Sequence, residues 1–188
     1  MTDRVRLIFA VTTFSVLEPV TVRAANRMAA DCGDDEECIV STVFETHRAL
    51  IRYAWEQDGV DVYRSWKVSV REGVGDCDCM VIANNAILSV LGFPVGVACV
   101  RQAGVQDHIW SLVWIPRGST SRRTIALDLA APNAPVGWEE PASAYTGRKN
   151  YRYDAHEWIA WCRRYYNGMR PESAVEDILR TAPTIRPM

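Results

Sequence analysis

The stretch Gly75-Asp76-Cys77-Asp78-Cys79 decides the fold, because it leads directly into an apolar run that ends at Gly92. The run predicts a buried helix over residues 78–91. Cys77 then lies where the helix begins, and a helix N-terminus lowers the pKa of a thiol. A thiol must become a thiolate before it attacks, so Cys77 is the candidate nucleophile of this sequence.

A histidine and an aspartate suited to activating this thiol follow in predicted strands. Three segments are rich in apolar and β-branched residues and predict strands: 94–101, 108–115 and 124–129. His108 starts the second strand and Asp128 lies in the third. With these two residues opposed in a hairpin, the turn centres on Gly118, inside the most turn-like segment of the region. Opposed residues share a face of the sheet, so Asp128 is expected to hold the His108 imidazole.

Helical spacing of apolar residues is found on both sides of the strands. It predicts helices over four segments: 20–31, 35–57, 158–166 and 171–179. Residues 5–11 predict a strand because β-branched and aromatic residues dominate there, and residues 60–76 predict an irregular approach to the cysteine-bearing helix. Helices, then a small antiparallel sheet, then further helices predict an α+β fold. We expect one domain over residues 1–150 and a helical extension over 151–188 that packs on the core or on a partner.

The composition is that of a globular domain. The chain has 188 residues, 48% of them hydrophobic, and this excludes long-range disorder. A net charge of −2 argues against a nucleic-acid partner bound by general phosphate attraction. No apolar run reaches the length of about 18 residues that a membrane-spanning helix needs, so membrane insertion is not expected.

The N-terminal segment shares features with a signal peptide but is not expected to direct secretion. Arg4 and Arg6 precede an apolar segment that threonine and serine residues interrupt. The six cysteines indicate a reducing compartment, because a chain with this much apolar sequence needs no disulfide framework. Cys32 and Cys38 flank an acidic loop and are expected to be free thiols or a chance close pair.

Other interpretations of these residues stay open at this point. Cys77 is also compatible with an inert buried thiol, because free cysteine is among the most buried residue types. Asp76 to Cys79 carry metal-ligand side chains without the second spaced pair of a zinc site, so neither a metal nor a cofactor is expected. His47 is expected at a surface or interface. Trp110 shares a strand face with His108 and is expected in the core or in a pocket wall.

The order of these motifs resembles the transglutaminase-like superfamily. Gly-Asp-Cys-Asp enters an apolar helix, Leu91-Gly92-Phe93-Pro94 leads into a valine-rich strand, and His108 and Leu127-Asp128 follow. The resemblance covers about residues 42–140 and implies a papain-like thiol core. It implies Cys77 as nucleophile, His108 as base and Asp128 as the acid that orients the base.

The same resemblance extends to details of the site and to a genomic context. The backbone N–H of Cys77 is expected to stabilise an oxyanion, with the Trp66 indole as the candidate second donor and Asp76, Asp78 and Trp110 flanking the site. The segments around 52–61 and 135–139 resemble versions encoded in phage and prophage genomes. The chain departs from the family where Cys79 replaces a common aspartate. It departs again where Leu129-Ala130 replaces a common Pro-Thr.

Two functions follow from these features. The first is cysteine-dependent acyl transfer, as amide or peptide hydrolysis or as transamidation, with a protein or peptide substrate. The second is a phage virion or assembly protein that reuses the fold to bind neighbouring virion proteins. The expected location is the host cytoplasm during assembly, or the virion itself under the structural hypothesis. Fold alone does not choose between these functions, because function depends on the site.

Overall fold

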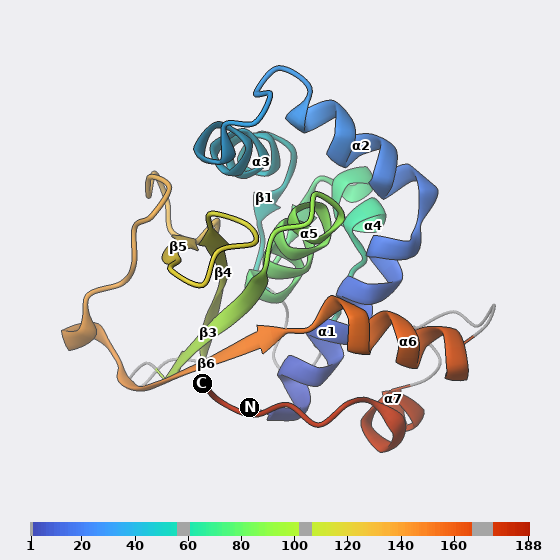
Figure 1. The fold of residues 1–188 in the computed structure, drawn as a ribbon. Helices are drawn as coiled ribbons and strands as arrows, with labels where there is room; N and C mark the ends of the chain where they lie inside the picture. The colour runs from blue at the N-terminus through green and yellow to red at the C-terminus, as the bar shows by residue number, and fades with distance from the viewer. Residues whose placement is uncertain (1, 56–60, 102–106, 167–174) are drawn as a thin grey trace.

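The computed structural model describes residues 2–55, 61–101, 107–166 and 175–188. A central helix, α5 (Cys77–Val90), lies between a four-stranded sheet and a layer of helices from the N-terminal half (Figure 1). Helix, sheet and helix follow one another along the chain, which confirms the α+β class.

The cysteine-bearing helix forms as its sequence predicts, but it begins at Cys77, one residue before the predicted start. Asp76 caps it, because its carboxylate accepts a hydrogen bond from the backbone N–H of Cys79 at 3.0 Å. The chain leaves the helix through Gly92, whose φ of 80° lies in the left-handed region that favours glycine. All twelve consecutive residues from Cys77 to Leu88 are buried. A helix that is buried on every side must lie at the centre of the fold.

The sheet contains the three predicted strands and a fourth. The strands are β3 (Val95–Arg101), β4 (His108–Ile115), β5 (Arg123–Leu127) and β6 (Thr146–Tyr153), and they pair antiparallel in the order β5-β4-β3-β6. The sequence did not predict β6, because charged and polar residues dominate this strand at the edge of the sheet. Residue 150, where we expected the domain to end, lies within β6, which pairs along the length of β3.

The hairpin register differs from the predicted one by a two-residue step. Leu112 pairs with Ala126 and Ile115 with Arg123, so the hairpin centres on residue 119 rather than on Gly118. The direct opposition expected for His108 and Asp128 is therefore wrong. Because side chains alternate with a period of two, a two-residue step keeps both on the same face of the sheet.

The N-terminal segment is helical, and the strand predicted over residues 5–11 is wrong. α1 (Thr2–Leu17) packs against α5 and against the C-terminal helices. Its apolar residues cover all sides, so burial outweighs the β preference of its branched side chains. The hydroxyls of Thr13 and Ser15 donate to the carbonyls of Phe9 and Val11, which satisfies them inside the helix.

The segments before α5 hold more regular structure than the sequence predicts. α2 (Pro19–Ala29) and α3 (Glu36–Leu50) match predicted helices, although α3 ends earlier than residue 57. The approach expected to be irregular contains α4 (Trp66–Glu72). Short parallel strands, β1 (Arg52–Tyr53) and β2 (Val74–Gly75), then place Tyr53 beside Gly75, two residues before Cys77.

The C-terminal segment is folded onto the core. The helices α6 (Ala155–Tyr165) and α7 (Val175–Thr181) both pack against α1 (Figure 1). The Trp158 ring lies 5.8 Å from that of Phe9. A β-bridge between Tyr151 and Pro187 ties the C-terminus to the sheet. The predicted start of the last helix, before residue 175, lies outside the described residues.

The N-terminal half contains a disulfide that the sequence analysis did not predict. Cys32 and Cys38 are joined in a disulfide with a Cα–Cα distance of 5.6 Å, so the expectation of free thiols is wrong.

Among the described residues, no single helix is long and apolar enough to cross a membrane. α1 and α2 together meet that length and composition, but they are bent by 82° relative to each other.

A buried chain of hydrogen bonds joins α3, α4 and α5. The Trp66 indole N–H donates to His47 Nε2 at 3.0 Å, and His47 Nδ1 lies 2.8 Å from the Asn84 amide oxygen. An indole nitrogen only donates, so Nε2 must accept and Nδ1 must carry the proton. His47 is fully buried, which corrects the expected surface position. Burial lowers the pKa of His47 to about 4, because charging it there loses hydration and breaks the bond from Trp66.

These buried hydrogen bonds around His47 predict that the protein loses stability in acid. His47 stays neutral in the folded state, while in the unfolded chain it takes up a proton as the pH falls below about 6.5. Its contribution is therefore complete above pH 6.5 and is lost as the pH falls towards 4, by about 3 kcal/mol in total. The measurement is the unfolding free energy from denaturant titrations between pH 7 and pH 4, for the wild type and for His47→Gln.

The comparison of the two proteins at each pH isolates His47 from the other groups that titrate in this range. The difference in stability between wild type and His47→Gln should shrink as the pH falls. A difference that stays constant from pH 7 to pH 4 would show that His47 is not held neutral.

Candidate active site

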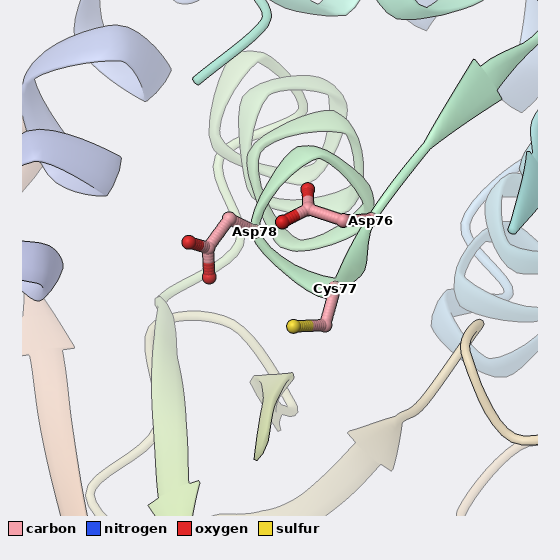
Figure 2. Close-up of side chains that lie close together, drawn as sticks. All are labelled: Asp76, Cys77 and Asp78. Carbon is pink, nitrogen blue, oxygen red and sulfur yellow. The ribbon is translucent and has the colours of Figure 1, made fainter. Parts of the chain in front are cut away.

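Cys77 lies at the first residue of α5, with its sulfur close to α1 and to the start of β4. Its Sγ accepts a hydrogen bond from the Arg4 guanidinium at 3.3 Å, and the backbone N–H of Ile109 lies close enough to lower the pKa of the thiol. Figure 2 shows Asp76, Cys77 and Asp78 leaving the first turn of α5 in different directions. The thiol is 8% exposed, so it is nearly but not fully closed off from solvent.

His108 and Asp128 contact each other directly. His108 Nε2 lies 2.8 Å from Asp128 Oδ2. The other carboxylate oxygen accepts from the backbone N–H groups of Ala130 and Ala131, at 3.1 and 3.3 Å. A carboxylate only accepts, so Nε2 carries the proton and Nδ1 keeps the lone pair that a base needs. The departure from the family at Leu129 leaves both backbone donors in place.

Tyr53 lies within electrostatic range of the thiol and of two carboxylates. Burial is the main cause that raises the pKa of its phenol to about 12, with smaller contributions from Cys77, Asp76 and Asp128. Tyr53 also lines a cleft of about 510 Å³ together with His108 and Asp128. Cys77 itself is not among the described residues that line this cleft.

The rest of the cleft presents aromatic and apolar surface beside one acidic group. Its further walls are two tryptophans, a loop rich in alanine and proline, and one acidic residue: Trp55, Trp138, residues 130–135 and Glu140. Trp55 is 59% exposed, so most of its ring is available to stack on a bound group.

The environment of Cys77 keeps the resting thiol protonated. Burial raises its pKa first, and the negative charge of Asp78 raises it further, while Arg4 opposes both. The sequence argument, in which the helix N-terminus lowers the pKa, is therefore outweighed by desolvation. Cys77 needs a base that removes its proton at the moment of attack.

The two aspartates beside Cys77 have structural partners. Asp76 caps α5, and Asp78 pairs with Arg4 at 2.8 Å. Burial raises the pKa of Asp78 to about 7 against the lowering effect of Arg4. Donor atoms of Asp76, Cys77 and Asp78 lie within 4.8 Å of one another, a grouping that could hold a cation. We assign the carboxylates to the cap and to Arg4, because those contacts already use them.

The predictions for the two aromatic residues of the site, Trp66 and Trp110, have different outcomes. The Trp66 indole N–H is bonded to His47 in the core, so the expectation that it serves as an oxyanion donor is wrong. Trp110 is buried on β4 in a small cluster with Ala98 and Leu112, and its ring lies 5.7 Å from that of His108. It thus packs beside the imidazole, and its burial confirms the expected core position.

Sequence reasoning missed Arg4 and Tyr53. Arg4 meets Asp78 across 74 residues of sequence, and no local pattern signals such a contact. The aromatic side chain of Tyr53 was included in a predicted helix, so its place on β1 beside Gly75 was hidden.

Comparison with known proteins identifies the fold. No family model matches the sequence, and no curated protein matches it. Among solved structures, Legionella pneumophila LapG superposes with a TM-score of 0.52 at 14% sequence identity, over 91% of this chain and 97% of LapG. LapG is a transglutaminase-like cysteine protease. The chain therefore has a transglutaminase-like fold, as the order of its motifs indicated.

The contacts of the three histidines predict a different tautomer for the neutral form of each. His47 should be the Nδ1–H tautomer, His108 the Nε2–H tautomer, and the exposed His156 a mixture of both. Long-range proton–nitrogen correlation spectra at neutral pH measure this directly. In Asp128→Ala, His108 should lose its preference while His47 keeps its own. A mixed tautomer for His108 in the wild type would contradict the observed contact with Asp128.

Proposed function

We propose that this protein is a cysteine-dependent acyl-transfer enzyme that cleaves an amide or peptide bond, with Cys77 as nucleophile, His108 as base and Asp128 as the orienting group. The observation that carries the proposal is the paired placement of the groups. The Cys77 thiol lies close to the backbone N–H of Ile109, the residue after His108, and His108 is held through Nε2 by Asp128. The likeness to LapG supports the same class of chemistry at the level of the fold.

The first half of the reaction makes a thioester. His108 Nδ1 takes the Sγ proton while the sulfur lone pair forms a bond to the substrate carbonyl carbon, and the carbonyl π pair moves to oxygen. The oxyanion faces the first turn of α5, whose N–H groups lack partners within the helix. When the carbonyl re-forms, the carbon–nitrogen bond breaks, and the leaving nitrogen takes the proton from His108. The amine departs and the acyl group stays on Cys77.

The second half removes the acyl group. His108 Nδ1 takes a proton from water as the water oxygen bonds to the thioester carbon. The carbon–sulfur bond then breaks, the acid departs, and Sγ recovers the proton from His108. An amine in place of water gives transamidation by the same steps. Asp128 stabilises the imidazolium in both halves.

The proposed substrate is a protein or peptide segment held in an extended form. The cleft beside His108 and Asp128 offers exposed aromatic surface at Trp55 and has the volume for several side chains. A role in a phage particle or in its assembly rests on sequence resemblance alone. Part of that resemblance, at residues 58–60, lies outside the described residues.

The test uses p-nitrophenyl acetate, an activated ester that acylates a working nucleophile without needing the natural substrate. The wild type should release a burst of nitrophenolate and carry one acetyl group on the Cys77 peptide, located by mass spectrometry. Cys77→Ala should give no burst. His108→Ala should slow acylation by about 10²- to 10⁴-fold, the range that a general base supplies.

The free cysteines Cys79, Cys99 and Cys162 serve as internal controls, because all three are buried and none begins α5 beside Arg4 as Cys77 does. Cys77→Ala removes one small side chain and should cost about 1 kcal/mol of stability, so its thermal unfolding curve should stay cooperative. Equal acetylation of Cys77 and the three control cysteines, or an unchanged rate in His108→Ala, would contradict the proposal.

A further inference from the structure

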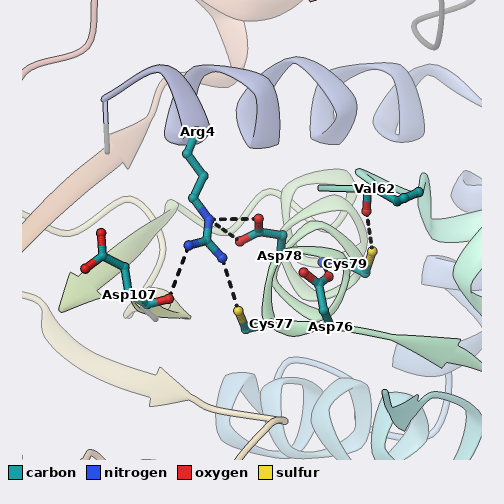
Figure 3. A network of polar contacts seen from close by, with 7 residues as sticks. All are labelled: Arg4, Val62, Asp76, Cys77, Asp78, Cys79 and Asp107. Carbon is teal, nitrogen blue, oxygen red and sulfur yellow. Dashed lines mark hydrogen bonds and ion pairs between the residues drawn. The ribbon is translucent and has the colours of Figure 1, made fainter. Parts of the chain in front are cut away.

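Arg4 contacts three groups around the active-site thiol at once. Its Nε donates to both oxygens of Asp78, at 2.8 and 3.0 Å, one Nη donates to the carbonyl of Asp107 at 3.2 Å, and the other Nη donates to Cys77 Sγ at 3.3 Å. Figure 3 shows the guanidinium between these three groups, reaching down from α1. The side chain is 15% exposed, so these bonds form in a largely desolvated space.

We propose that Arg4 is a further catalytic residue of this site, whose guanidinium binds and stabilises the Cys77 thiolate. The assignment as catalytic rests on the proposed function, whereas the thiolate contact can be tested without it. The ion pair with Asp78 and the bond to Asp107 fix the plane of the guanidinium, and that plane aims the remaining Nη at the sulfur.

The bond from Arg4 to sulfur strengthens when the thiol ionises. A neutral thiol is a weak hydrogen-bond acceptor, whereas a thiolate forms a charge-assisted bond to a guanidinium. Only an interaction that is stronger in the reacting state than in the resting state speeds the reaction. A buried ion pair with a purely structural role would be complete with Asp78 alone and would need no donor directed at Cys77.

The other charged and titratable groups around Cys77 mostly oppose its ionisation. They come from several elements around the thiol: Asp76, which caps α5, Asp78 on α5, Tyr53 on β1, Tyr63 before α4, Cys99 on β3, and Asp107 and His108 at the start of β4. The negative charges of Asp76 and Asp78 raise the pKa of Cys77, and Arg4 lowers it. Arg4 thus offsets the acidic groups that cap and anchor the same helix turn.

The experiment measures the rate of Cys77 alkylation by iodoacetamide against pH, followed on the Cys77 peptide by mass spectrometry. In Arg4→Gln the apparent pKa of this reaction should rise by at least one, a tenfold loss of thiolate at a given pH below it. In Asp78→Asn it should fall, because a negative charge beside the sulfur is removed. Opposite shifts from the two partners of one ion pair distinguish an electrostatic role from a structural one.

The matched control is Arg6→Gln. Arg6 lies on the same helix and donates to the carbonyl of Ala182, away from the thiol. Its replacement should leave the alkylation profile of Cys77 unchanged. An equal shift in Arg6→Gln would trace the effect to the docking of α1 and would overturn the proposal.

A second comparison covers the case in which Arg4→Gln unfolds, since it leaves Asp78 buried without a partner. The double variant Arg4→Gln/Asp78→Asn places two neutral amides in that position and is compared with Asp78→Asn alone. The proposal expects a higher apparent pKa in the double variant, and equal values would overturn it. The apparent pKa of Cys77 alkylation can shift as expected while the wild type forms no acetyl-enzyme with p-nitrophenyl acetate. In that case the thiolate contact stands and the proposed function fails.

Discussion

Burial of the first turn of α5 is the constraint on which the rest of the site depends. It puts a thiol and a carboxylate, Cys77 and Asp78, in a desolvated space between α1 and β4. Desolvation disfavours the charged form of both groups, so each needs a partner. Asp78 pairs with Arg4, and the same guanidinium donates a hydrogen bond to Cys77. Arg4 reaches this space because α1, whose apolar residues are buried, packs against α5.

Two histidines illustrate how the fold assigns opposite protonation patterns to one side chain. His47 is held between a group that only donates and an amide oxygen, which fixes the proton on Nδ1 and keeps the ring neutral in the core. His108 meets a carboxylate through Nε2, which leaves Nδ1 able to accept a proton. The first arrangement locks three helices together. The second leaves a nitrogen with a free lone pair at the edge of a cleft.

The sequence predicts the parts of this structure that depend on local patterns. The apolar run after Cys77 predicted α5, and the alternation of the strands put His108 and Asp128 on one face even though the register was two residues off. α1 was missed because β-branched residues suggest a strand when burial cannot be seen, and β6 because an edge strand needs little apolar sequence. Arg4 and the role of Trp66 depend on contacts between distant segments, which no local pattern encodes.

The central claim is that Cys77, His108 and Asp128 act as one unit, and a double-mutant cycle tests it most directly. The measurement is the acylation rate by p-nitrophenyl acetate in the wild type, Asp128→Asn, His108→Ala and the double variant. If Asp128 acts only through the imidazole, Asp128→Asn slows acylation in the wild-type background and adds nothing in the His108→Ala background. Equal fold-losses in the two backgrounds would contradict the claim.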